Sequence, residues 1–325
     1  MSTATAVPQT FELEGDDALT TLRDTGIRHL MRDAAARFRA ADGFSHARAL
    51  AFQITLTALP ALIAAVGLAT ATGQETFRRV LQETMIGLSP GPTGDLLTQA
   101  FEQASTTASS GSGRLALAGG FVAALLSATV AMTQVERGAN RIYGVEQDRP
   151  AVSKYWHGFM LACSAGFLIF GAFVLFVAGR EIGGALGAVS PDGALATVWL
   201  IGRWPVGIAL VVLAFSMLFK ESPRRRQPSP SWLAVGSLLA VAMWLVLTAL
   251  LGLYLALSRQ FGDAYGPLAG VIGGLLWALL TSLALYLGLA FSAQLEAVRA
   301  GKPGPRTGEQ ENPSEPVGRG SRDSL

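Results

Sequence analysis

Six long apolar runs constrain what this chain can fold into more than any other feature. They cover residues 47–70, 115–133, 157–178, 195–219, 232–257 and 268–293. A helix needs about 20 apolar residues to cross a hydrocarbon layer of ~30 Å. Lipid-exposed backbone must also satisfy its own hydrogen bonds, and the alternating segments of about 10 residues typical of a β-barrel are not visible. The sequence therefore predicts an all-α, polytopic helical membrane protein with six transmembrane helices.

Composition and charge agree with this prediction. The 325 residues are 50% hydrophobic and 15% charged, whereas roughly a quarter of the residues of a soluble domain are charged. The net charge of +2 is too small to indicate a nucleic-acid partner, and the single cysteine, Cys163, excludes an intrachain disulfide. We expect membrane lipids as the partners of the chain and leave a homo-oligomer open.

The distribution of lysine and arginine predicts the orientation. Nineteen of the 25 basic residues precede the first run or lie at its start, lie in the second or fourth loop, or follow the last run. Five lie in the alternate loops, and Arg203 lies within a run. Cytoplasmic loops carry the excess of Lys and Arg. The sequence therefore predicts that both termini are cytoplasmic.

The chain divides into a cytoplasmic N-terminal segment (1–45), a six-helix transmembrane domain (46–300) and a disordered cytoplasmic tail (301–325). We expect disorder over residues 1–15, followed by a basic amphipathic helix over 17–41. Such a helix lies either on an anionic membrane surface or against the cytoplasmic loops, and both placements stay open. The outer loop 71–113 could cap a vestibule or dock a partner. We favour the alternative, in which it rests on the bilayer surface.

Nothing in the sequence indicates a catalytic centre. The three histidines, His29, His46 and His157, are far apart and form no metal-ligand pattern. The 37 glycines include no phosphate-binding loop followed by Lys and Ser or Thr. We therefore expect no enzyme, no cofactor and no metal.

Polar residues within the runs are candidates for a substrate pathway, because they are costly in lipid. Gln53, Thr57 and Pro60 follow one another at spacings of four and three and share a helix face. Arg203 is the only charge well inside a run, where it costs about 3 kcal/mol at the bilayer centre. It either faces an outer cavity, which we favour, or reaches the headgroups. Tyr265 fits the outer interface.

Glycines spaced four apart indicate close helix packing. Gly266, Gly270 and Gly274 form one such stripe, and Gly120 begins another with two alanines. Small residues on one face allow helix backbones to approach closely in lipid. The sequence therefore predicts helix–helix contacts at these positions.

Four motifs, in order along residues 30–300, carry a family resemblance. The stretch 263–277 begins DAYGPLAGVI, 49–60 holds the aromatic Phe52 and ends at Pro60, 140–144 reads NRIYG before Arg149-Pro150, and Arg203 is followed by Trp204-Pro205. Together they resemble the YihY/virulence factor BrkB family. The chain departs from the family pattern at Gln53 and Thr57, and at the end of the last run, where Gln294 and Glu296 reverse the usual order of acid and amide.

The resemblance implies a six-span protein of the bacterial inner (plasma) membrane with a poorly defined activity. It would also bring a former ribonuclease label, which we reject because the sequence has no metal cluster, basic RNA groove or large soluble domain. We expect a transporter or exporter of an unknown substrate, lipid-like or amphipathic. The alternative is a non-transporting scaffold for envelope integrity or virulence, and an intramembrane enzyme is a third reading.

Overall fold

The computed structural model describes residues 4–10, 12–71, 111–185, 194–258, 269–302 and 304. Every regular element in these residues is an α-helix, which confirms the all-α prediction. The helices are α1 (Gly15–Thr25), α2 (Ile27–Ala40), α3 (Gly43–Ala71), α6 (Gly111–Tyr143), α7 (Ala151–Ala185), α8 (Ala194–Glu221), α9 (Pro230–Leu257) and α11 (Ala269–Arg299). The predicted outer loop and tail, with Tyr265 and Gly266, lie almost wholly outside the described residues.

Within the described residues, five helices are long and apolar enough to cross a membrane. The spans are Ala118–Tyr143, Ala151–Phe176, Val198–Glu221, Pro230–Leu257 and Gly270–Arg299. The remaining predicted run falls on α3, which has 29 residues. Because many side chains in the second half of α3 lie outside the described part of the chain, a sixth span stays a prediction.

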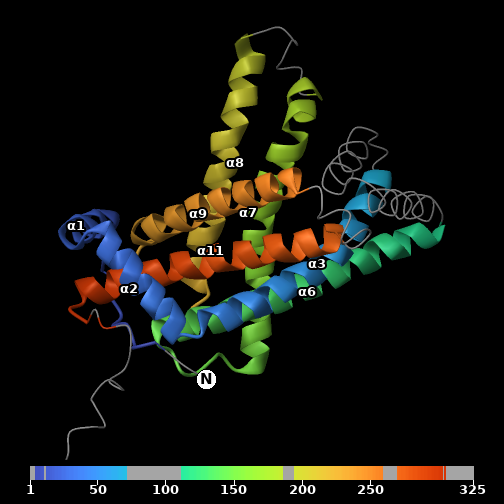
Figure 1. Ribbon diagram of the computed structural model, residues 1–325. Helices are drawn as coiled ribbons and strands as arrows, with labels where there is room; N and C mark the ends of the chain where they lie inside the picture. The colour runs from blue at the N-terminus through green and yellow to red at the C-terminus, as the bar shows by residue number, and fades with distance from the viewer. Residues whose placement is uncertain are drawn as a thin grey trace, which may run out of the picture.

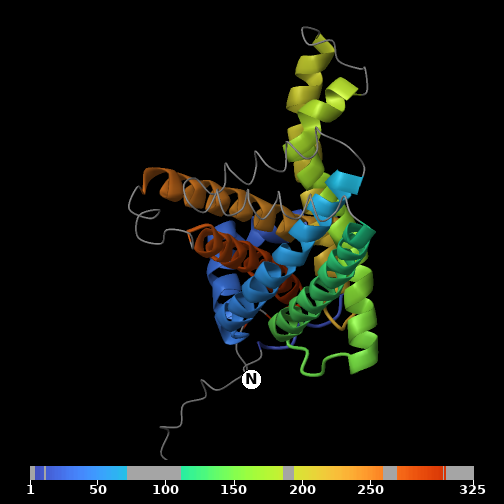
Figure 2. The same ribbon diagram turned by 90° about the vertical axis from the view of Figure 1, so that its right-hand side faces the viewer.

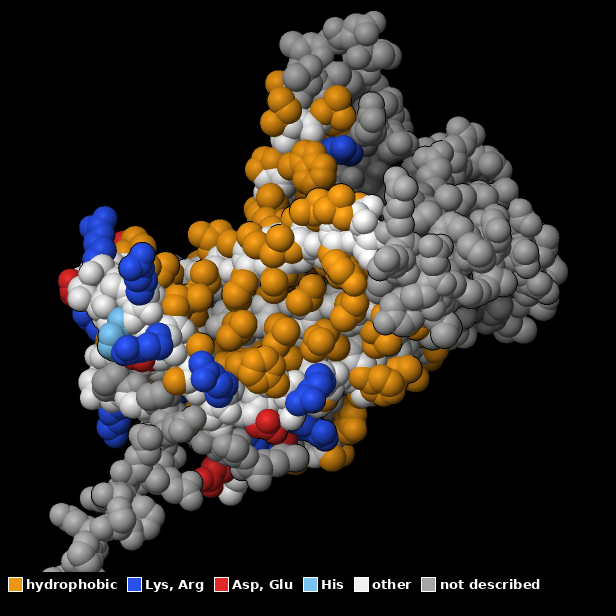
Figure 3. All heavy atoms as spheres, in the orientation of Figure 1, with side chains coloured by type: hydrophobic (Ala, Val, Ile, Leu, Met, Phe, Trp, Pro, Cys, Tyr) orange, Lys and Arg blue, Asp and Glu red, His pale blue; other side chains and the backbone are white. Residues whose placement is uncertain are grey.

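The surface of the helices is apolar over a wide band. Leu126 on α6, Phe167 on α7 and Leu257 on α9 are 62%, 75% and 74% exposed. Figure 3 shows hydrophobic side chains covering the middle of the molecule, while most charged side chains on this face gather at one end. An exposed apolar surface of this extent needs lipid around it. The chain is a multi-pass membrane protein.

Three helix pairs make up the membrane domain: α3 with α6, α7 with α8, and α9 with α11. Helix α11 also packs on α3 and α2, and α6 and α9 contact α7 and α8, respectively. Figures 1 and 2 show the helices meeting at one end and diverging from it, with α7 and α8 rising away from the others. We call the shared end the polar end; among the described residues it comprises 4–10, 12–46, 136–154, 220–229 and 294–302.

The packed core lies in the half of the molecule next to the polar end. On α9, Trp232, Leu233 and Val241 are almost fully buried, whereas Leu250 is 56% exposed. On α11, the side chains from Tyr286 onward are mostly buried, while Val271 and Leu275 in the first two turns are 53% and 38% exposed. Burial therefore decreases along the helices in the direction in which they diverge.

A close helix crossing joins α9 and α11 through small residues. A Cβ added to Gly236 would lie 1.9 Å from Ser292 Oγ, and one added to Gly288 would lie 2.4 Å from Ala240 Cβ. Neither glycine belongs to the stripes predicted from the sequence. Small residues allow this approach, and the dispersion contacts it creates hold helices together in lipid.

The glycines that the sequence did single out have a different setting. Gly120 is buried, Gly270 is half-buried, and Gly274 is exposed with open space around an added Cβ. The neighbouring Gly273 is buried and faces Leu255 of α9. The packing role assigned to Gly270 stays a prediction.

Candidate functional site

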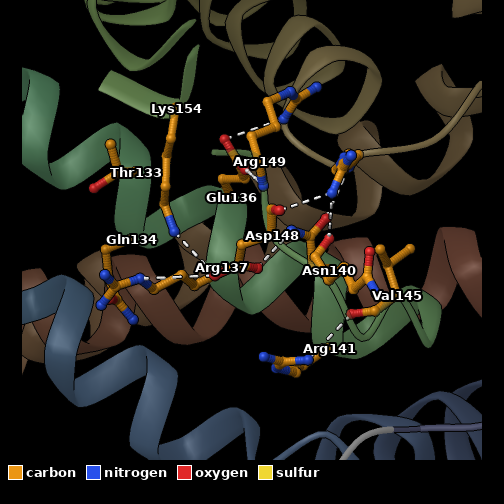
Figure 4. Close-up of polar contacts among 12 residues, drawn as sticks. Thr133, Gln134, Glu136, Arg137, Asn140, Arg141, Val145, Asp148, Arg149 and Lys154 are labelled. Atoms are coloured by element: carbon orange, nitrogen blue, oxygen red, sulfur yellow. Dashed lines mark hydrogen bonds and ion pairs between the residues drawn. The ribbon is translucent and has the colours of Figure 1, made fainter. Parts of the chain in front are cut away.

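The buried charged side chains gather at the polar end in two clusters. The first, shown in Figure 4, is centred on Glu136 of α6 and Arg149 of the following loop. The Glu136 side chain is 1% exposed, and its Oε2 lies 3.1 Å from Arg149 Nη1. Arg149 also donates hydrogen bonds to the carbonyl oxygens of Ser222 and Glu221, at 3.0 and 3.3 Å. One arginine therefore ties α6 to the C-terminal end of α8.

Asp148 joins the same loop to the segment after α8. Its Oδ1 accepts a hydrogen bond from Asn140 Nδ2 at 2.9 Å, and its Oδ2 lies 3.0 Å from Lys154 Nζ. Asn140 Oδ1 in turn accepts from the backbone N–H of Arg224 at 2.7 Å. Burial raises the pKa of Asp148, but the bonds from Asn140 and Lys154 outweigh it and hold the pKa below its ordinary value.

The second cluster surrounds Glu296 near the end of α11, and we call it the Glu296 cluster. Arg225 Nη2 donates to Glu296 Oε1, and this oxygen also accepts from Thr10 Oγ1 at 2.6 Å. The Arg225 guanidinium lies 4.7 Å from the centre of the Tyr143 ring, a cation–π distance. The side chains of Glu296 and Arg225 are 1% and 2% exposed.

Arg37 of α2 is the second arginine of this cluster. It is fully buried and donates from Nε to Gln294 Oε1 at 2.9 Å, and from Nη1 to the carbonyl oxygen of Thr5 at 2.9 Å. Burial lowers the pKa of Arg37 to about 10, so the side chain is still charged at neutral pH. Helix α2 packs against the membrane helix α11. Its placement on an anionic membrane surface or against the cytoplasmic loops stays a prediction.

Residues 4–10 cross the Glu296 cluster. The backbone N–H groups of Ala4 and Val7 donate to the carbonyl oxygens of Arg141 and Tyr143, both at 3.1 Å. Arg225 donates to the carbonyl oxygens of Val7 and Pro8 at 3.1 and 3.2 Å. Disorder over residues 1–15 is therefore wrong for this stretch, because buried groups from distant parts of the chain fix its backbone.

The predicted pathway residues do not come together. On α3, Gln53, Thr57 and Pro60 are half-buried, and Thr57 Oγ1 donates to the Gln53 carbonyl oxygen of its own helix at 2.8 Å. Arg203 is half-buried on α8, with its Cζ 5.7 Å from the centre of the Trp204 ring. Helix α3 packs on α6 and α11, whereas α8 packs on α7 and α9. A shared pathway lined by these residues stays a prediction.

Arg203 has an unusual electrostatic setting. Its Nε and Nη1 atoms are shielded from solvent and have no hydrogen-bond partner within the described residues. Within a membrane span, leaving two N–H groups of a guanidinium without hydrogen-bond acceptors costs free energy. They are therefore suited to bind an anionic oxygen.

The histidines serve as local hydrogen-bonding groups. His46 Nδ1 lies 3.3 Å from Gln134 Nε2, and His157 Nε2 lies 2.8 Å from the Glu221 carbonyl oxygen. His29 Nδ1 lies 3.1 Å from Asp33 Oδ2. In the described ranges, no three His, Cys, Asp or Glu side chains are placed to hold a metal ion.

Fold and site together define a helical multi-pass membrane protein whose helices are joined at one end by buried charged side chains. The family model of virulence factor BrkB matches residues 34–312, and the chain belongs to this family. The resemblance drawn from the sequence motifs is thereby confirmed.

One curated relative is the ribonuclease-like protein YfkH of Bacillus subtilis (strain 168). It is 27% identical over 177 residues, which cover 54% of this chain and 64% of the relative. The match therefore spans less than two thirds of the relative's length. No solved structure matches the chain.

The reversed order of acid and amide in the last run has a structural meaning. Gln294 meets Arg37, and Glu296 meets Arg225, so the two polar positions face two different arginines. The sequence raised doubt about a strict role for an acid at position 294. In the structure, Glu296, two residues later, provides the carboxylate that pairs with Arg225. Sequence reasoning missed this cluster because its members come from five segments that are distant in the sequence.

Proposed function

We propose that this protein is a transporter or exporter of the bacterial inner membrane, with its polar end in the cytoplasm. The observation that supports this function is the difference between the two ends of the molecule. The helices are closely packed and joined by charges at the polar end, and they diverge toward the other end (Figures 1 and 2). A transporter that alternates between two openings has one closed end in each state.

The Glu296 cluster has the chemistry of a closure that can open. Buried ion pairs cost desolvation energy, and apolar residues of similar size often stabilise a protein as well or better. Besides the Arg225–Glu296 ion pair, Arg37 and Arg225 contact carbonyl oxygens and polar side chains. Water can replace such partners when the contact separates, whereas interdigitated apolar side chains have no substitute in water.

Arg203 suggests the chemical class of the substrate. Around it, the diverging parts of α7 and α8 present mainly apolar side chains, including Phe173 and Ile201, which are 41% and 66% exposed. A cation with free donors in an apolar setting suits the charged head of an amphipathic or lipid-like anion. Gln53, Thr57, Pro60 and Tyr265 are assigned to the same pathway as hypotheses.

Reconstitution in liposomes tests this function. The purified protein is supplied with fluorescent phospholipids and amphipathic anions, and their movement across the bilayer is measured. We expect flux of at least one class, its loss in Arg203→Leu, and partial retention in Arg203→Lys, which keeps the charge but loses the planar fork. Arg28→Leu, which removes an exposed arginine of α2, is the matched control and should transport normally.

Two other results would replace the proposal. An intact protein that moves no substrate in this panel would favour the scaffold, the second function that the sequence left open. Cleavage of RNA by the purified protein, the activity in the name of the Bacillus relative, would make it an enzyme.

A further inference from the structure

The segment 4–10 is held to the membrane domain by contacts that concentrate on few groups. Arg225 donates to two of its carbonyl oxygens, Arg37 donates to a third, and Thr10 donates to Glu296 from both its hydroxyl and its backbone N–H. Two further backbone bonds connect it to Arg141 and Tyr143 at the end of α6. Loss of the Glu296 cluster would therefore release the segment as one unit.

The residues that follow the segment are anchored separately. The Ser229 hydroxyl donates to the Leu13 carbonyl oxygen at 2.8 Å, and the Gly15 N–H donates to Ser231 Oγ at 3.1 Å. Arg299 Nη2 lies 2.8 Å from Asp17 Oδ1. These contacts hold the start of α1 against α9 and α11, so the segment can swing away while α1 stays in place.

The closed arrangement leaves polar atoms beneath the segment without partners. Glu296 Oε2, Arg37 Nη2 and Thr5 Oγ1 are buried and make no hydrogen bond within the described part of the protein. A buried polar group without a partner is costly, and water satisfies it once the segment leaves. This cost partly offsets the contacts that keep the segment closed.

We propose that residues 4–10 are a latch over the polar end, and that Glu296 is the residue that holds it. When the latch is closed, it covers Arg37, Arg225 and Glu296. When it opens, these three side chains face the cytoplasm and the closure at the polar end is lost. The role that we assign to the latch, which is to keep the cytoplasmic exit of the pathway shut, rests on the proposed transport function. Its docking over the polar end does not.

Thiol labelling measures whether the latch is closed. In a Cys163→Ala background, Val7→Cys places a thiol at a position that is 6% exposed, and Gln9→Cys places one at an exposed position of the same segment. Each is treated with a charged maleimide, and the labelling rate is followed by mass. With the latch closed, the Val7→Cys protein should react at least about tenfold more slowly than the Gln9→Cys protein.

The variant that opens the latch is Thr10→Val, which removes the hydroxyl bonded to Glu296 and keeps the side-chain shape. A hydrogen bond to a charged acceptor is strong enough that its loss should speed labelling of the Val7→Cys protein about tenfold. The matched control is Thr20→Val, because the Thr20 hydroxyl bonds only within α1, to the Asp16 carbonyl oxygen. It should leave the labelling rate unchanged.

Three results would overturn the latch. Equal labelling of Val7→Cys and Gln9→Cys proteins would mean that the segment is not docked. An unchanged rate in Thr10→Val would remove Glu296 as the holding residue, and an equal increase in Thr20→Val would show general loosening. Faster labelling in Thr10→Val alone supports the latch, and if no variant then moves any substrate in liposomes, the transport function fails while the latch stands.

Discussion

The crossing of α9 and α11 predicts that Gly288→Ala destabilises the membrane domain. The added Cβ would lie 2.4 Å from Ala240 Cβ and 3.0 Å from the Gly236 carbonyl oxygen. An ordinary contact of this kind is at least 3.4 Å, so the two helices must part by about 1 Å. A gap of that size forfeits a quarter to a half of each dispersion contact along the crossing.

The net effect combines two opposing terms. Overpacking of a core costs roughly 1–3 kcal/mol, and replacing a helical glycine by alanine returns up to about 1 kcal/mol. Gly274→Ala on the same helix should show only the gain in helix propensity, because nothing lies within 4 Å of its added Cβ. Comparing the two variants cancels helix propensity, and Gly288→Ala should be about 1–3 kcal/mol less stable than Gly274→Ala.

Thermal unfolding in a mild detergent, followed by tryptophan fluorescence, measures this difference. The double variant Gly288→Ala with Ala240→Gly removes the opposing methyl group and should recover most of the loss. Equal melting temperatures for Gly288→Ala and Gly274→Ala would refute the close crossing.

Three further predictions concern the polar end. Arg149→Gln leaves Glu136 buried without its cation and should cost about 3–5 kcal/mol in detergent unfolding, and adding Glu136→Gln should restore part of it. The pKa of Asp148 is lowered on folding, so the ionised side chain stabilises the folded protein above the ordinary carboxyl pKa of about 4. This contribution is lost as the pH falls through the lower pKa of the folded state. Asp148→Asn should therefore remove this part of the acid sensitivity, measured as the free energy of unfolding at different pH. Gly144 has φ of +76° and an added Cβ would lie 2.4 Å from Ala6 Cα, so Gly144→Ala should speed labelling of the Val7→Cys protein.

Apolar length was enough to predict five of the membrane helices, because a bilayer requires about 20 apolar residues wherever a helix crosses it. It was not enough to predict the segment 4–10, whose own residues have no strong helical or strand pattern. Its conformation depends on Glu296, 286 residues away from Thr10 in the sequence. Contacts over such separations leave no local signal.

The candidate site was predicted in part for the same reason. Arg203 is visible in the sequence because a lone charge in an apolar run is conspicuous. Arg37 lies among other arginines of an amphipathic helix, so its complete burial could not be told from the exposure of its neighbours. Glu296 lies at the end of the last run, where a carboxylate at the membrane surface is an adequate explanation.

The orientation of the polar end is the claim on which the closure, the latch and the six-span topology all depend. Reporter domains fused after Lys220, after Arg299 and at Gly111 test it directly, because the first two sites adjoin the polar end and the third lies at the far end of α6. We predict cytoplasmic activity from the Lys220 and Arg299 fusions and an external signal from the Gly111 fusion. A cytoplasmic signal from Gly111 would contradict the account.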